Sequence, residues 1–427
     1  MPLRLDSQSA DFPTRFRAFL GVKREATQDV EQAVRAIIAD VRARGDRALT
    51  ELTAKYDGVD LAKAGLRVTA TEINAAEKSC DAEALAALKL ARDRIEAFHQ
   101  RQQPRDTRFT DPLGVELGSR WSAIEAVGLY VPGGTAAYPS SVLMNVVPAR
   151  VAGVPRLVMV VPAPAPLVPA AARLVGVDEI YRIGGAQAVA ALAYGTETIA
   201  PVAKIVGPGN AYVAVAKRLV FGDVGIDMIA GPSEVLILAD KTGNVDWIAA
   251  DLLAQAEHDA SAQSVLITDD AALAAQVEKA VESQLRTLER ASVAGASWRD
   301  FGAIITVGKL DDAITLVDRL APEHLEIIAV DAEQLAARIR NAGAIFIGAH
   351  TPEVIGDYVA GSNHVLPTAR SARFSSGLGV TDFMKRTSLL KCGPEQLRAL
   401  GPAAITLGEA EGLFAHARSV AIRLNQR

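Results

Sequence analysis

The sequence predicts an α/β protein built on parallel sheets, and three observations lead to this class. Short apolar stretches typical of buried strands alternate with longer helical stretches through most of the chain. Gly-rich turns follow several of the strand-like stretches, as they do where a strand leads into a helix in parallel units. The chain has 427 residues, more than one ordinary core holds, which indicates about three domains, or two with extensions.

The beginning of the chain precedes the alternating pattern. We expect residues 1–22 to form an N-terminal arm. Residues 28–99 carry apolar side chains at three- and four-residue spacing, with Arg and Glu on the opposite face. This region is therefore predicted to be helical and to hold no functional site.

Two blocks of alternating strands and helices follow, at about 127–237 and 238–366. In the first block the strands are expected at 157–164, 178–183 and 203–209, and the helices at 166–177, 184–195 and 209–220. In the second block the strands are expected at 264–268, 303–308, 324–330 and 344–348, and the helices at 273–288, 311–321 and 333–341. Such alternation implies parallel βαβ units. The tail from about Phe374 is mixed and ends in a helical stretch, 408–424.

Composition and charge exclude several classes of protein. The formal net charge is -5 and no basic run of five residues occurs, so no nucleic-acid partner is expected. Two cysteines, Cys80 and Cys392, argue against a disulfide framework and for a reducing, cytoplasmic setting. The first residues lack the apolar core of a signal peptide. The longest uncharged run, between Arg156 and Arg173, contains several prolines, so no membrane span is expected.

Three Gly-rich turns in the first block are candidates for ligand binding: VPGG (131–134), GGAQ (184–187) and GPGN (207–210). Such turns let backbone N–H groups approach a phosphate at a helix N-terminus. None matches the dinucleotide fingerprint, because Tyr212 stands where the third glycine of G-x-G-x-x-G is expected. A tight turn that needs glycine for its backbone conformation explains any single one of them. Three turns in one block favour a ligand at the carboxyl ends of the strands.

Two local patterns contain candidate chemical groups. Glu323 and His324, in APEHLEI, stand immediately before a strand, and a carboxylate beside an imidazole is an acid–base couple near neutral pH. An exposed charged turn also explains such a pair. Gln255 and His258, in LLAQAEHD, are three residues apart and so share a helix face. They do not identify a metal site by themselves, since H-E-x-x-H is absent and zinc prefers other ligands to glutamine.

The motifs taken together are more specific than each alone. The chain resembles the histidinol dehydrogenases from about residue 25 onward, in motifs that occur in the same order: GLYVPGGTAAYPSS, IGGAQAVAALAYGT, VGPGNAYV, IDMIAGPSEV, LLAQAEHD, APEHLEI, GSNHVLPT, ARFSSGLGV and EGLFAHA. The resemblance implies an α/β fold with two Rossmann-like parallel-sheet domains, a helical N-terminal region and a swapped C-terminal tail. The implied segments are an arm (1–22), an α/β domain with the metal and catalytic residues (23–126 plus 238–366), an α/β domain with NAD-contacting turns (127–237) and a dimerisation tail (367–427).

The resemblance also implies the residues of the site. The expected zinc ligands are Gln255, His258, Asp357 and His416, with His416 reaching the site from the other subunit of a homodimer. The expected NAD contacts are Tyr130, Gln187 and Asn210, one in each Gly-rich turn or beside it. The expected substrate contacts are Ser233, Gln255, His258, Glu323, His324, Asp357, Glu411 and His416. Glu323 and His324 match the catalytic pair of the family.

The implied reaction is a NAD-dependent and zinc-dependent four-electron oxidation of L-histidinol, through L-histidinaldehyde, to L-histidine, in the last steps of histidine biosynthesis. Our hypothesis is that His324 removes the proton of the alcohol and that Glu323 activates the water that hydrates the aldehyde. Zinc is expected to hold the amine and imidazole nitrogens of the substrate. Ligation by His, Gln and Asp accepts zinc or manganese, so the sequence leaves the metal open.

Three alternatives remain open at this point. One is an aldehyde dehydrogenase with a cysteine nucleophile, although neither Cys80 nor Cys392 lies in a Gly-rich catalytic turn. Another is a relative that keeps zinc and NAD but oxidises a different small alcohol. The last is a non-catalytic assembly in which zinc only ties two chains together, which gives no use to Glu323 and His324.

Overall fold

The first parallel sheet has five strands in the order β6-β5-β4-β7-β8. The computed structural model describes residues 1–21, 28–133, 138–229 and 231–425. The strands are β4 (Ala126–Tyr130), β5 (Arg156–Val160), β6 (Glu179–Tyr181), β7 (Lys204–Val206) and β8 (Gly225–Ile226). The helices between them are α7 (Pro139–Val151), α8 (Leu167–Leu174), α9 (Gly185–Tyr194) and α10 (Ala211–Val220). Every residue of β4 is buried, as expected for a parallel strand covered by helices on both faces.

The second parallel sheet has six strands in the order β1-β11-β10-β9-β12-β13. Its strands are β1 (Leu3–Asp6), β9 (Glu234–Ala239), β10 (Gln263–Thr268), β11 (Ala303–Thr306), β12 (His324–Ile328) and β13 (Ala344–Ile347). Its helices are α1 (Phe12–Leu20), α11 (Val245–Ala256), α12 (Ala271–Leu285), α13 (Ala291–Phe301), α14 (Leu310–Leu320), α15 (Ala332–Ala336) and α16 (Glu353–Tyr358). The prediction of two parallel-sheet blocks is confirmed.

Both sheets share one topology. Counted along the chain from β4 and from β9, the strands of each sheet lie in the order 3-2-1-4-5, and β1 adds one more strand beside β11. This order leaves a crevice where the chain changes direction across the sheet, between β4 and β7 and between β9 and β12. The carboxyl end of that crevice is where open α/β sheets commonly bind ligands.

The domain boundaries expected from the sequence are wrong in three places. Four helices pack on α7 to α10 of the first sheet: α2 (Gln28–Arg44), α3 (Asp46–Tyr56), α5 (Ala70–Ser79) and α6 (Ala82–Gln100). The second domain meets α6 at its side, where Arg94 donates to the Val359 and Ala360 carbonyls after α16. An amphipathic pattern shows that a helix has a core face but not which sheet that face covers. The second sheet begins already at β9, inside the segment 127–237.

The third correction concerns the N-terminal arm. Within the described part of 1–22, β1 pairs in parallel with β11, and Phe12, Phe16 and Phe19 of α1 are buried in the core of the six-stranded sheet. These residues therefore belong to the second domain. The apolar side chains of α1 repeat at helical spacing, but their partners lie about 300 residues further along the chain, so a local pattern does not reveal them.

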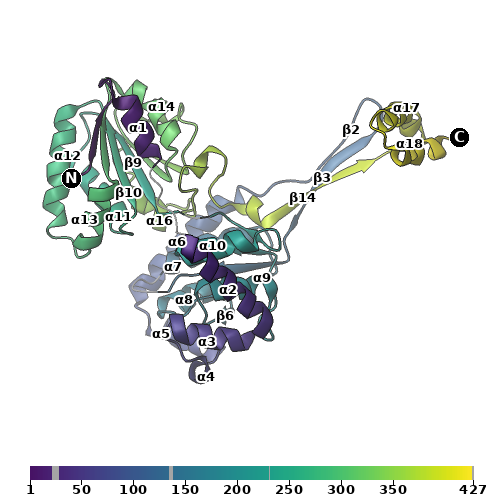
Figure 1. Cartoon of the computed structure of the whole chain (residues 1–427), viewed down its shortest axis with the longest axis horizontal. Coiled ribbons are helices and arrows are strands. Elements are labelled where there is room, and N and C mark those ends of the chain that lie inside the picture. The colour runs from purple at the N-terminus through teal and green to yellow at the C-terminus, as the bar shows by residue number, and fades with distance from the viewer. Residues whose placement is uncertain (22–27, 134–137, 230, 426–427) are drawn as a thin grey trace.

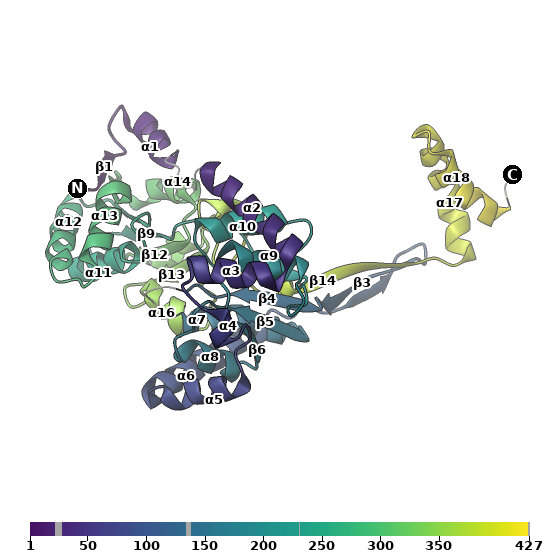
Figure 2. The same ribbon diagram turned by 60° about the horizontal axis from the view of Figure 1, so that its bottom comes forward.

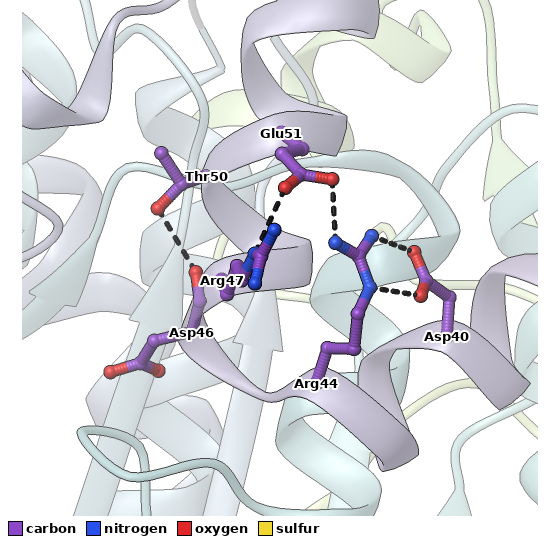
Figure 3. Close-up of polar contacts among 6 residues, drawn as sticks. All are labelled: Asp40, Arg44, Asp46, Arg47, Thr50 and Glu51. Carbon is purple, nitrogen blue, oxygen red and sulfur yellow. Dashed lines mark hydrogen bonds and ion pairs between the residues drawn. The ribbon is translucent and has the colours of Figure 1, made fainter.

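The junction of α2 and α3 is held by exposed ion pairs (Figure 3). Arg44 donates to both carboxylate oxygens of Asp40 at 2.6 Å and to Glu51 at 2.6 Å, across the turn at Gly45. Each exposed pair contributes about 0–1 kcal/mol, so the network orients the two helices more than it stabilises them. The short helix α4 (Leu61–Ala64) follows.

An antiparallel arm extends from the two sheets (Figures 1 and 2). Its strands β2 (Thr107–Thr110), β3 (Glu116–Ala123) and β14 (Met384–Lys391) form a sheet in the order β14-β3-β2. Helices α17 (Pro394–Ala410) and α18 (Phe414–Ala421) pack on each other at its tip. Short 3-10 turns occur at Ser371–Arg373, Val380–Phe383 and Ile422–Leu424. Among the described residues, no helix is both long and apolar enough to cross a membrane.

Candidate active site

The acid–base residues expected from the sequence lie at the amino end of the six-stranded sheet. His324 is the first residue of β12, Glu323 precedes it, and Glu234 is the first residue of β9. Strands β9 and β12 are parallel neighbours, with His324 opposite Val235, so these residues meet at one edge. Ser233 lies at the same edge, where its carbonyl accepts a hydrogen bond from the Gln263 N–H at 3.0 Å.

The His324 ring is held by one nitrogen and open at the other. Its Nδ1 lies 3.0 Å from the backbone carbonyl oxygen of Glu234, and since a carbonyl only accepts, Nδ1–H is the donor. Its Nε2 is buried, lies 3.4 Å from Oδ1 of Asp357 and has no hydrogen-bond partner in the described chain. The ring is 5.9 Å from that of Phe346. Nε2 is therefore the nitrogen available for proton transfer.

Two buried glutamates adjoin the other side of the ring. Glu323 and Glu353 each place Oε2 at 3.8 Å from His324 Nδ1. Glu323 Oε2 also accepts the backbone N–H of Glu234 at 3.0 Å. Burial raises the pKa of Glu323 to about 7, although His324 lowers it. Burial likewise raises the pKa of Glu353 to about 8 against the opposing effect of His324.

The carboxyl groups act on His324 in return. Burial alone lowers the pKa of the imidazole, but Glu323, Glu353 and Asp357 together raise it well above its usual range. For Asp357, burial raises the pKa, but the ion pair with His324 outweighs this effect and lowers the pKa below its usual range, so this group is ionised. Glu323 and Glu353 have pKa values near neutral, so they can exchange protons with the imidazole that they adjoin.

Sequence reasoning missed Glu353, Glu326 and Asp251. Glu353 and Asp357 are four residues apart on α16 and flank the two nitrogens of His324. Glu326 lies two residues after His324 on β12, on the same face, and its Oε1 accepts the Glu353 N–H at 2.6 Å. Glu326 also hydrogen-bonds to Asp251 of α11. The signal was a glutamate inside the otherwise apolar strand HLEII.

Three of the four expected metal ligands come from elements around this edge. Gln255 lies in the last turn of α11 with 1% of its surface exposed, and its buried Oε1 has no hydrogen-bond partner in the described chain. His258 follows the end of α11, close enough to Asp357 and His324 for their charges to act on its pKa. An unpartnered buried amide oxygen beside an imidazole and an ionised carboxylate fits a divalent metal ion.

The fourth expected ligand is not near these groups within one chain. His416 lies on α18 and Glu411 directly follows α17, both exposed at the tip of the arm (Figures 1 and 2). In the part of the chain that the structure describes, no three His, Cys, Asp or Glu side chains are grouped to hold a metal. Of the expected set, only His258 and Asp357 are of these residue types and lie near one another.

The expected NAD contacts lie at the carboxyl end of the five-stranded sheet. Tyr130 ends β4 and its hydroxyl accepts the N–H of Gly185 at 3.0 Å, which joins two of the Gly-rich turns. Gln187 is buried and donates to Asp57 Oδ2 at 3.1 Å. Asn210 caps α10, its Oδ1 accepting two N–H groups of the first turn. Gly134 of the VPGG turn lies outside the described residues.

Gly207 brings the third turn to the same place. A Cβ atom on Gly207 would lie 2.1 Å from the carbonyl oxygen of Tyr130, and its φ is +111°. Only glycine allows this approach without strain, so the ends of β4 and β7 meet at the crevice of the sheet.

Residues 227–233 connect β8 to β9. A link this short keeps the carboxyl end of one sheet within about 25 Å of the amino end of the other.

The cysteines do not lie at this site. The Cys80 thiol follows α5 and donates to the Ala76 carbonyl at 3.2 Å, and burial raises its pKa. Cys392 is exposed on the arm directly after β14. A cysteine nucleophile needs a lowered pKa beside the reacting groups, whereas burial raises the pKa of Cys80, and Cys392 lies on the arm, away from Glu323 and His324.

The comparisons with known proteins agree along the whole chain. The family model described as histidinol dehydrogenase matches residues 21–424. The histidinol dehydrogenase of Bradyrhizobium diazoefficiens is 74% identical over 429 residues, covering 100% of both chains, and that of Rhodopseudomonas palustris is 72% identical over 431 residues with the same coverage. The crystal structure of histidinol dehydrogenase from Elizabethkingia anophelis superposes with a TM-score of 0.94 at 35% identity, covering 99% of this chain and 98% of that one. A family match over 21–424 and an identity of 74% over the full length show that this chain belongs to the histidinol dehydrogenase family.

Proposed function

We propose that this protein oxidises L-histidinol, through L-histidinaldehyde, to L-histidine, in a NAD-dependent and zinc-dependent four-electron reaction that ends histidine biosynthesis. The family assignment supports the substrate and the product. The observation that carries the mechanism is the buried Glu323–His324 pair: Nε2 of His324 has no hydrogen-bond partner in the described chain, and Oε1 of Gln255 on α11 has none either.

The first oxidation needs a base for the hydroxyl proton and an acceptor for the hydride. Because Nδ1 of His324 donates to the Glu234 carbonyl, Nε2 takes the hydroxyl proton while the carbinol hydride passes to NAD. The imidazolium that forms is stabilised by the neighbouring Glu323, Glu353 and Asp357. One NADH and the aldehyde result.

The second oxidation needs water. Glu323, with a pKa of about 7, takes a proton from the water that adds to the aldehyde carbon, and the imidazolium of His324 returns its proton to the carbonyl oxygen, so the hydrate forms and His324 is again a base. His324 then removes a hydroxyl proton of the hydrate while a second hydride passes to a second NAD. The product is the carboxylic acid. Glu323 and His324, whose pKa values are both raised, thus accept protons in different steps of the same site: Glu323 in the hydration and His324 in the two oxidations.

The metal site is proposed to be shared between two chains. Gln255, His258 and Asp357 would hold zinc with His416 of the partner subunit, and Ser233 would contact the substrate together with Glu411 of the partner subunit. When bound, zinc holds the substrate nitrogens and orients the carbinol carbon. The unpartnered Gln255 Oε1 and the ionised Asp357 support this set of ligands.

A homodimer with swapped C-terminal tails is proposed because the arm exposes apolar side chains. Large apolar side chains stay exposed there in the single chain: Phe109 (59%), Leu390 (70%), Leu407 (64%) and Phe414 (70%). An extended arm with exposed apolar side chains is typical of a surface that a partner covers. A second chain whose arm lies over this body would bring its α18, with His416 of the partner subunit, to the site.

The stoichiometry of NADH tests the proposed reaction. Purified protein is incubated with L-histidinol and excess NAD, with and without a chelator, and NADH and histidine are counted. We expect two NADH for each histidinol consumed, histidine as the product and loss of activity on chelation. A folded, zinc-loaded protein that forms no NADH from histidinol would show that the framework serves a different alcohol.

A further inference from the structure

A buried ion pair lies beneath the GPGN turn, and neither of its residues is among the expected NAD, metal or substrate contacts. Lys217 of α10 and Asp227, directly after β8, pair with side chains only 2% and 1% exposed. Taking two charges out of water costs several kcal/mol per ion, and an apolar pair of similar volume is often as stable. Stability alone is therefore a weak reason for this pair.

The pair binds both polar backbone groups of Gly207. The Gly207 N–H donates to Asp227 Oδ2 at 2.8 Å, and Lys217 Nζ donates to the Gly207 carbonyl at 3.0 Å. Gly207 has a φ of +111°, which glycine adopts readily, and both of its polar backbone groups are satisfied from outside the turn. Lys217 and Asp227 supply these contacts from a helix and from a strand end.

The same pair is connected to the acid–base site through the chain. Asp227 Oδ1 accepts the Met228 N–H at 2.7 Å, which fixes the start of the connector 227–233. That connector ends at Ser233 and leads into Glu234, whose backbone binds Glu323 and His324. The Lys217–Asp227 pair therefore holds the turn that contains Asn210. It also holds the start of the connector 227–233, which leads to Ser233 and Glu234 at the amino end of β9.

We propose that Lys217 and Asp227 are positioning residues for the dinucleotide: they hold the turn 207–210 so that Asn210 and the N-terminus of α10 meet NAD. The inference rests on the proposed NAD-dependent reaction and on the NAD contact at Asn210 that the family resemblance implies. The inference concerns the affinity for NAD and not for zinc, because the hydrogen bonds of Lys217 and Asp227 go to Gly207, Met228 and each other.

The test is a titration of the full-length protein with NADH, followed by fluorescence. The double variant Lys217→Met/Asp227→Asn removes both charges at once, so it leaves no unpaired buried ion. We expect Kd for NADH to rise about tenfold, the effect of losing about one hydrogen bond to a charged group. Zinc content and KM for L-histidinol should not change. Arg218→Met is the matched control, because it removes an exposed cation of the same helix that pairs with Glu31; its Kd should equal that of the wild type.

Two results would overturn the inference. One is an unchanged Kd for NADH in a folded double variant. The other, which applies even if the variant does not fold, is fast amide exchange in the wild type: the Gly207 amide should exchange far more slowly than in a free peptide, because Asp227 accepts it. A wild-type protein that does not bind NADH at all is a different result, which overturns the proposed function and this inference with it.

Discussion

His324 takes its chemistry from buried carboxyl groups on two elements. Glu323 comes from the start of β12, and Glu353 and Asp357 come from one face of α16. Between them they flank both ring nitrogens, at 3.8 Å and 3.4 Å. A solvated pair of the same residues would have its ordinary proton affinities. Burial, more than the identity of the residues, shifts the pKa values at this candidate site.

The sequence predicts the Glu323–His324 pair because the two residues are neighbours. It does not predict Glu353, which lies about thirty residues later and reaches the ring only after β12, β13 and α16 have packed. The three-residue spacing of Gln255 and His258 singled out both residues, but α11 ends at Ala256, so His258 follows the helix and does not share its face, and the unpartnered state of Gln255 Oε1 depends on the surrounding fold.

Replacing His324 tests its role as the base. His324→Asn should lower kcat about 10²- to 10⁴-fold, the usual contribution of a positioned general base. Zinc content, measured by metal analysis, should be unchanged because His324 is not among the proposed ligands. Loss of zinc along with activity would instead make His324 a ligand and contradict the assignment.

Glu353→Gln tests the buried carboxyl group through stability. The pKa of Glu353 is raised from 4.5 to about 8. Between these values the folded chain keeps a proton that the unfolded chain has lost, so stability falls as pH rises through this window. Glutamine does not ionise, so its free energy of unfolding does not fall in this window. The difference in free energy of unfolding between the variant and the wild type should therefore shift by about 2–4 kcal/mol in favour of the variant from pH 5 to pH 9.

Urea unfolding at both pH values measures this difference. Glu333→Gln, at an exposed position in α15, is the matched control and should follow the wild type. If the curves of Glu353→Gln and the wild type stay parallel from pH 5 to pH 9, Glu353 is not a buried acid in the folded protein.

At the scale of elements, the turns at the carboxyl end of the first sheet depend on close backbone contacts. Gly207→Ala should destabilise the protein by about 2 kcal/mol or more, because its Cβ would lie 2.1 Å from the Tyr130 carbonyl. Gly222→Ala is the control: its φ of +112° matches that of Gly207, but nothing lies within 4 Å of its Cβ. Equal urea midpoints for the two variants would show that the approach of β7 to β4 is not tight.

The elements themselves were largely predictable, and their assembly was not. The alternation of apolar strands and helices after residue 127 predicts both parallel sheets, since buried parallel strands are apolar throughout. The helices before it were assigned to the wrong sheet, because α2 and α6 reveal their apolar faces but not their partners. The edge position of β1 likewise depends on a contact with β11 far along the chain.

At the scale of the whole molecule, the two sheets have the same strand order, but the expected functional residues lie at opposite ends of their strands. The first offers its carboxyl end, with Tyr130 and Asn210, and the second offers its amino end, with Glu323 and His324. The connector 227–233 joins these two ends directly. At the carboxyl end of the second sheet, Asp240 accepts the Val330 N–H at 2.9 Å and so ties β9 to β12. A cofactor and a substrate can thus meet between domains of the same topology.

The arm gives the molecule its extended shape and carries α18, with the proposed fourth metal ligand His416, away from both sheets (Figure 2). The sequence predicts a mixed tail, and the motif EGLFAHA marks His416, but local patterns do not show that β14 pairs with β3 and carries α17 and α18 away from both sheets. A shared site explains why a chain would hold a ligand so far from the other three.

The most direct test of the shared site is to mix two inactive variants, His258→Asn and His416→Asn, and to assay NADH formation from L-histidinol after the dimers have exchanged subunits. Each variant alone should be inactive, since every site lacks one zinc ligand. A hybrid dimer has one site with both residues intact, so activity should return, to about a quarter of the wild-type level when half of the dimers are hybrids. If no activity returns although the subunits have exchanged, each site is built within a single chain, and the proposed crossing of His416 is wrong.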